Sequence, residues 1–237
     1  MNHIDKYRSY MVSQNMDSCA KTHLTQPFLP NPAITMSYQF GLCVGEIAKH
    51  LALLLRNANP KWNSDWSIFD QELVEQALEE QHWPKKLAEQ IAEDKRFFLD
   101  ELMEDLCGLR PPSWVLIPQM VEVISSLART GNVILIGHGA TVVTADMPSV
   151  FHVRLTGSRG KRSEQVQKNR DLAPAEAAKL IKKEDYQRER FIKTYFKARL
   201  DNELLYDLTI NTDRLSSEEV TALVFVGAMR FFTNTSI

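Results

Sequence analysis

Residues 34–48 combine the features of a site for an anion. A short β-prone stretch, Ile34 to Ser37, runs into a loop bracketed by Gly41 and Gly45, and an apolar helical pattern follows directly. The backbone N–H groups of a tight loop and the positive end of the next helix can hold a phosphate together. The usual phosphate loop also carries a Lys for the β- and γ-phosphates and a hydroxyl for Mg²⁺, and neither is at its expected place. We therefore predict a degenerate phosphate loop made by Gly41, Leu42, Cys43, Val44, Gly45 and Glu46.

A second candidate feature is a basic stretch between Arg154 and Arg199. It holds fourteen of the 28 Lys and Arg residues against six acidic ones. Arginine presents a planar fork that suits phosphate oxygens, so several arginines beside a phosphate loop would stabilise a phosphoryl group in transfer. Two alternatives stay open: a solvated helical face with pairs such as Glu184–Arg188, and a surface for nucleic acid. Because the aromatic residues of the stretch recur at helical spacing, they favour a core over stacking platforms, and nucleic acid is not expected as a partner.

Composition sets broader limits. The 237 residues can bury a substantial core as one α/β domain, with or without an inserted helical part, and the net charge of −2 indicates neither a nucleic acid nor a membrane surface as partner. The three cysteines are widely spaced and form no C-x-x-C pair, which favours a reducing cytoplasm over disulfides or a zinc site. We expect no bound metal cluster and no membrane span. A thiol at the start of a helix would have a lowered pKa, so Cys43 is also considered as a redox-sensitive group.

Buried strands alternate with helices along most of the chain. A run that is apolar on both faces is typical of the middle of a parallel sheet, and residues 132–140 contain one. Further strands are predicted at 150–155 and 206–212. The apolar spacing predicts helices at 47–55, from 67 to 106, and at 115–129, 162–168, 174–182, 185–200 and 217–232. This order predicts an α/β fold in which helices cover both faces of a mainly parallel sheet.

Charge and proline content divide the chain further. Residues 64–107 hold thirteen acidic residues and only four basic ones, which sets this segment apart even if it is only a solvated face. We interpret residues 1–33 as an N-terminal arm and 34–237 as a single domain. Its core would consist of 34–62, 114–157 and 200–237, with a helical insertion at 63–113 and a lid at 158–199. The sequence leaves open whether the chain forms a homo-oligomer.

These motifs, in this order, resemble the cytidylate kinase-like family, relatives of the P-loop nucleoside monophosphate kinases. The resemblance covers nearly the whole chain. It rests on Ser13-Gln14, Ile34-Thr-Met-Ser37 with Gly41, Phe69-Asp70-Gln-Glu72-Leu73, Gly131-Asn-Val-Ile-Leu-Ile-Gly-His-Gly-Ala140, Phe151-His-Val-Arg-Leu155, Arg162, Asp185-x-x-Arg188 and Tyr206-Asp-Leu-Thr-Ile-Asn-Thr212. It implies a P-loop-type parallel-sheet core, a helical insertion for the monophosphate and an arginine-bearing lid. ATP and Mg²⁺ would be the cofactors and nucleotides the partners.

The resemblance also implies roles for single residues. Arg159, Arg162, Asp185 and Arg188 would serve the lid and the transferring phosphates. Asp70 would lie near the acceptor, and His138 would contact a base or phosphate. Asn211 and Thr212 would lie near the base of ATP. Local structural roles are the alternatives: a first-turn helix acid for Asp70, a cap for Asp185, and turn residues for His138 and Asn211.

The chain departs from the family pattern at four positions. Relatives carry glycines where Cys43 and Val44 stand, and commonly arginines where Tyr38 and His138 stand. If the loop needs positive φ at Cys43 and Val44, each side chain costs roughly 1–2 kcal/mol. The sequence thus supports two hypotheses: a kinase that phosphorylates a nucleoside monophosphate or similar acceptor, and a catalytically inactive nucleotide sensor or interaction module with the same fold. An RNA-binding protein is a third, resting on charge alone.

Overall fold

The fold is centred on a parallel sheet of five strands. The computed structural model describes residues 32–58, 65–70, 113–137 and 139–234. Within these residues the strand order is β2-β3-β1-β4-β5, and every neighbouring pair is parallel. The strands are β1 (Ala33–Tyr38), β2 (Ser67–Phe69), β3 (Val133–Ile136), β4 (Val150–Thr156) and β5 (Leu208–Asn211). The predicted α/β fold with a parallel sheet is confirmed.

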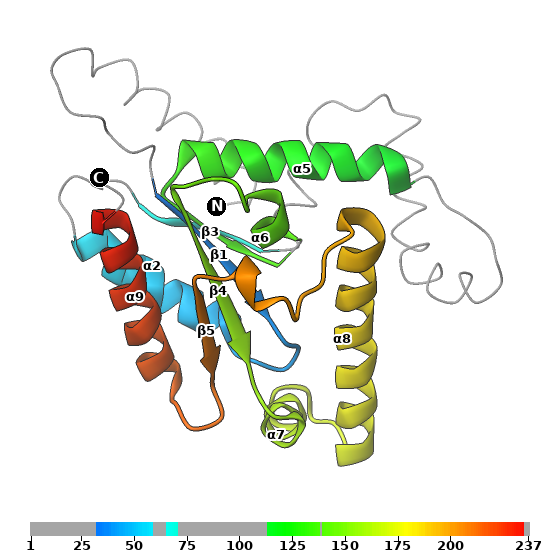
Figure 1. Ribbon diagram of the computed structural model, residues 1–237. Helices are drawn as coiled ribbons and strands as arrows, with labels where there is room; N and C mark the ends of the chain where they lie inside the picture. The colour runs from blue at the N-terminus through cyan, green and yellow to red at the C-terminus, as the bar shows by residue number, and fades with distance from the viewer. Residues whose placement is uncertain (1–31, 59–64, 71–112, 138, 235–237) are drawn as a thin grey trace, which may run out of the picture.

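Helices cover both faces of this sheet (Figure 1). On one face α2 (Val44–Ala58) packs beside α9 (Ser217–Asn234), and on the other α5 (Ser113–Thr130) packs beside the short α6 (Ala140–Val143). Helix α7 (Arg159–Arg170) follows the carboxyl end of β4 and packs against the long α8 (Pro174–Phe196). A 3₁₀ turn, η2 (Glu203–Leu205), precedes β5.

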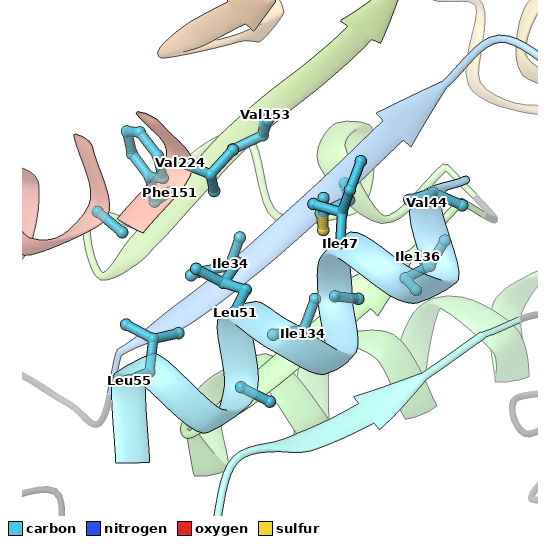
Figure 2. Packing of buried hydrophobic residues seen from close by; sticks show 14 of the residues in the cluster. Ile34, Val44, Ile47, Leu51, Leu55, Ile134, Ile136, Phe151, Val153 and Val224 are labelled. Carbon is cyan, nitrogen blue, oxygen red and sulfur yellow. The ribbon is translucent and has the colours of Figure 1, made fainter. Parts of the chain in front are cut away.

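The core between α2 and the sheet fixes where the loop after β1 lies. The buried residues Val44, Ile47, Leu51 and Leu55 recur every three or four positions and so form one stripe along α2 (Figure 2). This stripe packs in a cluster with alternate residues of β1, β3 and β4, among them Ile34. Burial of the stripe holds the first turn of α2 directly after the carboxyl end of β1.

The opposite face of the central strands carries polar side chains. Thr35 pairs in register with His152, and Ser37 pairs with Arg154 two residues further toward the carboxyl end. The Thr35 hydroxyl lies 2.8 Å from Nδ1 of the buried His152 and 3.0 Å from the Thr141 hydroxyl. The sheet therefore becomes polar on this face toward the edge where sites form in parallel folds.

Two predictions of local structure were wrong. The sequence pattern places the start of a helix at Ser67, but Ser67–Phe69 form β2, because Ile68 and Phe69 pair in parallel with Ile134 and Leu135 of β3. Pairing with a neighbouring strand outweighs the weak helical pattern of so short a segment. The remaining helices predicted up to residue 106, and most of the insertion at 63–113, lie outside the described residues.

The second error concerns α8. We predicted helices at 174–182 and 185–200, but residues 174–196 form one helix, and Asp185 lies inside it instead of capping a new one. Lys183 and Glu184 contain no helix breaker, so nothing ends the first helix there. The sequence also gave no indication of α6 or η2.

Candidate functional site

The loop from Gln39 to Cys43 joins β1 to α2 at the carboxyl edge of the sheet. Gly41 has φ +95°, a region that L side chains rarely adopt. A Cβ at this position would lie 3.0 Å from the backbone oxygen of Arg162 and 3.0 Å from Cγ2 of Val166. Glycine is required here for both reasons, and it brings the loop against α7.

The strain expected at Cys43 and Val44 is absent. Among the described residues the non-glycine positions with positive φ are Asn132, Asp171 and Lys197, so neither Cys43 nor Val44 adopts that conformation. Val44 is the first residue of α2 and is only 8% exposed, so its side chain contributes to the core. Because the helix starts at Val44, the loop does not require positive φ at either residue.

The Cys43 thiol differs from the redox-sensitive group that we considered. Burial raises the pKa of Cys43, and the carboxylate of Glu46 in the first turn of α2 raises it further. Hydrogen bonds with Asn169 and Gln165 lower it only in part. The expectation of a lowered pKa at this helix start was wrong, because burial and a neighbouring negative charge outweigh the helix dipole.

A cavity of 280 Å³ opens beside the loop. Gly41, Leu42 and Cys43 form one wall, and Lys161 and Lys168 of α7 reach it from another. Thr212, in the connection from β5 to α9, also lines it, and so do the carboxylates of Glu164 and Asp213. Lys161 lies 3.7 Å from Glu164, so the charges around the cavity are mixed. The structure thus brings together the loop, two lysines and one of the two residues predicted near the ATP base.

The other predicted members of this site lie elsewhere. Gly45 and Glu46 fall in the first turn of α2 and do not line the cavity. Asn211 ends β5, and its side-chain oxygen accepts a hydrogen bond from the backbone of Asp213 at 3.0 Å, as a turn residue would. Arg159, the first residue of α7, is exposed and does not line the cavity.

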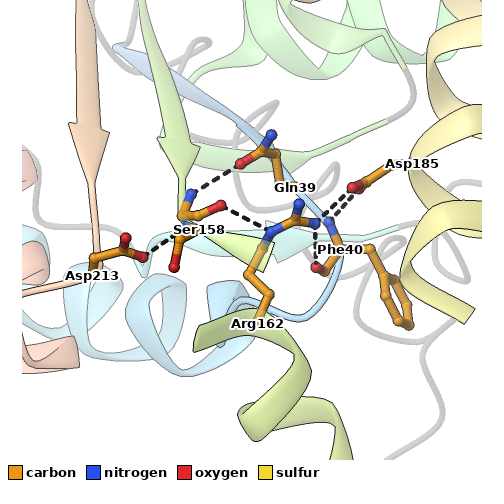
Figure 3. A network of polar contacts seen from close by, with 7 residues as sticks. Gln39, Phe40, Ser158, Arg162, Asp185 and Asp213 are labelled. Atoms are coloured by element: carbon orange, nitrogen blue, oxygen red, sulfur yellow. Dashed lines mark hydrogen bonds and ion pairs between the residues drawn. The ribbon is translucent and has the colours of Figure 1, made fainter. Parts of the chain in front are cut away.

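Arg162 and Asp185 form a buried connection around the loop (Figure 3). Arg162 is 3% exposed, and its Nη1 lies 2.6 Å from Oδ2 of Asp185 and 3.0 Å from the carbonyl oxygen of Phe40. Its Nε donates to the carbonyl of Gly157 at 3.0 Å. The other oxygen of Asp185 accepts the N–H of Phe40 at 2.9 Å. In this structure the two residues hold the loop to α7 and α8, and their polar groups are already engaged.

Two further hydrogen bonds extend this connection across the edge of the sheet (Figure 3). The N–H of Gly157 donates to the side chain of Gln39 at 2.9 Å, and the N–H of Ser158 donates to Asp213 at 2.7 Å. Ser158 is also the N-cap of α7. The three segments around the cavity are therefore fixed relative to one another.

Arg188 of α8 contacts the end of β1 and does not line the cavity. Its Nη2 donates to the Tyr38 hydroxyl at 2.9 Å, and its guanidinium carbon lies 4.2 Å from the centre of the Tyr38 ring and 5.5 Å from that of Phe40. Its Nη1 is buried and has no hydrogen-bond partner in the described part of the chain. Tyr38 thus holds this arginine at the end of β1.

Sequence reasoning did not single out Arg154. Its Nη1 donates to the Ser37 hydroxyl at 2.6 Å, and its guanidinium lies 5.7 Å from the centre of the Tyr206 ring. A charged residue inside the apolar strand 150–155 was the signal that could have identified it. Asp70 follows β2 and is exposed, whereas the predicted contact of His138 lies outside the described residues.

The chain matches the family model of the cytidylate kinase-like family over residues 33–214. It belongs to that family. This is the family that the loop, the lid motif and the strand motifs indicated, and membership makes the protein a nucleotide-kinase-type protein. No curated protein matches it in sequence.

Several solved structures resemble the fold. An uncharacterized protein from Eubacterium ventriosum is 16% identical with a TM-score of 0.60, and the match covers 86% of this chain and 99% of that one. A gluconokinase from Sinorhizobium meliloti 1021 is 11% identical with a TM-score of 0.45, covering 87% and 95%. A shikimate kinase from Acinetobacter baumannii in complex with shikimate is 13% identical with a TM-score of 0.44, covering 86% and 96%. At these identities the first likeness supports the fold alone.

Two searches of the described residues gave no candidates. No helix there has both the length and the apolar character needed to cross a membrane. Within the same residues, no three His, Cys, Asp or Glu side chains are grouped so that they could hold a metal ion.

Proposed function

We propose that this protein transfers a phosphoryl group from ATP to a small acceptor, a nucleoside monophosphate or a compound like it. The observation that carries the proposal is the open 280 Å³ cavity whose lining includes the glycine loop, two lysines of α7 and Thr212. A loop before a helix N-terminus supplies N–H donors for phosphate. Lys168, and Lys161 once it exchanges Glu164 for a phosphate, supply positive charge. The apolar residues Leu42 and Ile47 in the same lining suit the flat face of a base.

The residues present fit ATP better than they fit a metal held by the protein. Lys161 and Lys168 would neutralise its phosphates, and Thr212 would contact the base or the sugar. ATP, when bound, supplies the phosphoryl group, and Mg²⁺ would arrive on its phosphate oxygens, since this ion keeps its waters and needs few protein ligands.

The protein's own part in the reaction would be positioning and neutralisation of charge. Arg162 would act as a positioning residue, because it holds the loop through Phe40 and is only 3% exposed. Arg188, which keeps a buried and unpartnered Nη1, is better placed to meet a phosphoryl oxygen. Residues 158–199 would form the lid, and the segment 63–113 would complete the acceptor site.

A catalytically inactive nucleotide sensor is the second candidate. One observation favours it: Asp185 accepts the N–H of Phe40 and pairs with Arg162, so a carboxylate already occupies donors that a phosphate would use. A protein that binds ATP through the remaining donors and performs no transfer would have this arrangement. The cavity would then report the presence of nucleotide through the position of α7.

An assay for ADP formation separates the two candidates. The full chain is incubated with ATP and Mg²⁺ and with CMP, UMP, AMP or GMP in turn. ADP that forms only with one of these acceptors supports the kinase. Binding of ATP without acceptor-dependent ADP supports the sensor, and no binding of ATP contradicts both.

A further inference from the structure

Helix α9 presents large apolar side chains to solvent. Its inner side packs on α2, β4 and β5, and its other side faces outward (Figure 1). On that outward side Leu223 is 48% exposed and Val226 is 58% exposed. The two residues are three positions apart, so they lie on the same face of the helix. Apolar side chains grouped on an exposed helix face are more typical of an interaction surface than single ones are.

A charged residue stands at each end of this pair. Glu219 lies four residues before Leu223, and Arg230 lies four residues after Val226. Both are exposed, and a spacing of four keeps each on the same helix face as its apolar neighbour. Within residues 220–234 of the sequence, Arg230 is the only charged residue. The four residues therefore form one outward stripe that runs from acidic through apolar to basic.

The two charges of the outward stripe are not neutralised by each other or by a described neighbour. The carboxylate of Glu219 accepts the N–H of Ser216 at 2.7 Å through Oε2, which caps the helix with one oxygen. Among the described residues, no ion pair joins Glu219 or Arg230 to another side chain. No acidic residue lies within four positions of Arg230 in the sequence. Both charges are therefore open to a partner molecule.

The order of the outward stripe is symmetric. The spacings are four, three and four residues through the series Glu219, Leu223, Val226 and Arg230. In an antiparallel pair of such helices, with the two-fold axis midway along the stripe, Glu219 faces Arg230 of the second copy. Leu223 then faces Val226 of the second copy. Alternating spacings of three and four are those of helices that pack along one another with interlocking side chains.

We propose that α9 is the interface of a symmetric dimer, in which the outward stripe of one copy packs antiparallel on the same stripe of a second copy. Leu223 and Val226 form its apolar centre, and two pairs of Glu219 with Arg230 close its ends. A two-fold interface requires a surface that complements itself, whereas an unrelated protein partner would need no such symmetry. Antiparallel packing also sets the positive amino end of each helix beside the negative carboxyl end of the other.

The dimer should be weak. One helix pair buries less surface than the roughly 1,600 Å² of a standard interface, so association is expected at micromolar concentrations or above. The two charge pairs lie at the rim, where dissolved salt screens them. The inference does not depend on the proposed function, and its test needs no nucleotide.

Sedimentation velocity of the full chain over a range of micromolar concentrations tests the interface. Wild type is compared with Leu223→Glu and with Leu204→Glu, which changes a leucine that is 94% exposed in η2. We expect wild type to dimerise, Leu223→Glu to dimerise at least about tenfold more weakly, and Leu204→Glu to stay within about twofold of wild type. If circular dichroism shows that Leu223→Glu is misfolded, Val226→Glu serves in its place with the same expectation.

Two charge variants test the antiparallel order itself. Arg230→Glu makes acidic residues face each other at both ends, and Glu219→Arg makes arginines do so. Each variant alone should dimerise about tenfold more weakly than wild type. A mixture of the two restores opposite charges at both ends and should associate nearly as tightly as wild type. Concentrated salt should weaken wild type and the mixture alike.

The outcomes decide between this interface and others. A chain that stays monomeric throughout would overturn the proposal and leave the outward stripe to an occupant other than a second copy. A dimer that Leu223→Glu leaves intact would overturn it too, because the interface would then lie elsewhere. Charge variants that associate no better together than apart would contradict the antiparallel packing. Dimerisation that depends on Leu223 and is restored by mixing supports the proposal.

Discussion

The guanidinium of Arg162 and the carboxylate of Asp185 meet at 2.6 Å and join the first turn of α7 to the middle of α8. Arg162 is 3% exposed, whereas the Asp185 side chain is 30% exposed. The same two side chains hold the N–H and the carbonyl of Phe40. One ion pair therefore fixes where the glycine loop lies relative to α7 and α8.

Removal of this ion pair should destabilise the protein. Arg162→Met leaves Asp185 without its cation and the carbonyl of Phe40 without its donor, and the free energy of unfolding should fall by about 3 kcal/mol. Urea denaturation followed by circular dichroism measures the change. Arg199→Met, which breaks an exposed pair with Asp201, is the matched control and should change the free energy of unfolding far less, because water screens that pair. Equal costs for the two variants would contradict the role given to Arg162.

The two glycines that bracket the loop should respond differently to alanine. Gly41→Ala places a side chain at φ +95° and 3.0 Å from the backbone oxygen of Arg162, so it should lower the free energy of unfolding by about 2 kcal/mol. Gly45 lies in α2 with no atom within 4 Å of its would-be Cβ, so Gly45→Ala should raise stability by about 0.5 kcal/mol. Thermal and urea unfolding measure the stability of both variants. A Gly41→Ala variant as stable as Gly45→Ala would contradict the close approach of the loop to the backbone of Arg162.

Glycine at positions 43 and 44, where the family resemblance led us to expect it, should not improve this protein. Val44 is 8% exposed and packs in the core, so Val44→Gly should cost about 2 kcal/mol in the free energy of unfolding. Cys43→Gly removes no strain, because Cys43 does not have positive φ. The double variant should therefore be less stable than wild type in urea. A more stable double variant would show that the loop is strained after all.

His152 should make stability depend on pH. Burial lowers the pKa of His152 below its ordinary value of 6.5, against a smaller rise caused by Asp207. Below pH 6.5 the unfolded chain takes up a proton that the folded chain refuses, so this stability is present above pH 6.5 and is lost as the pH falls toward the folded value. The contribution of His152 to the change of the unfolding free energy with pH should not exceed about 1.4 kcal/mol per pH unit. Urea unfolding from pH 5 to 8 should show this loss of stability in wild type and not in His152→Gln. Parallel plots of the free energy of unfolding against pH for the two proteins would contradict the role of His152.

The sequence was a good guide to the central sheet. The apolar residues of 133–136 and 150–155 are buried on both faces, and such runs have few alternatives to the middle of a parallel sheet. The three-residue β2 was missed because its existence depends on pairing with β3, a contact between distant segments that no local pattern records. The single helix α8 was predicted as two helices because Asp185 has the character of a cap, a local signal that was misleading. In the structure its partners, Arg162 and Phe40, are 23 and 145 residues away.

Only the part of the candidate site that the backbone loop forms could be predicted from local sequence. Gly41 was identified because a glycine between a strand and a helix has a local meaning. Thr212 was identified through the family resemblance. Arg162 was expected on a phosphate, but its donors bind Gly157, Phe40 and Asp185. Such a connection depends on how α7 and α8 pack, which spacing along the chain does not encode. Arg154 was missed although the sequence carries a signal for it, a charged residue inside the apolar strand 150–155.

The most direct test of the account is calorimetric titration of ATP with Mg²⁺ into Gln165→Trp. Gln165 lines the cavity on α7, and the indole should fill part of its 280 Å³. Gln167→Trp, on the same helix and outside the cavity lining, is the control. We expect ATP to bind wild type and Gln167→Trp alike, and to stabilise both by about 2.7 kcal/mol at a hundredfold excess over Kd. Binding to Gln165→Trp should be at least tenfold weaker. Equal binding to all three proteins, or none to wild type, would contradict the assignment of this cavity to ATP.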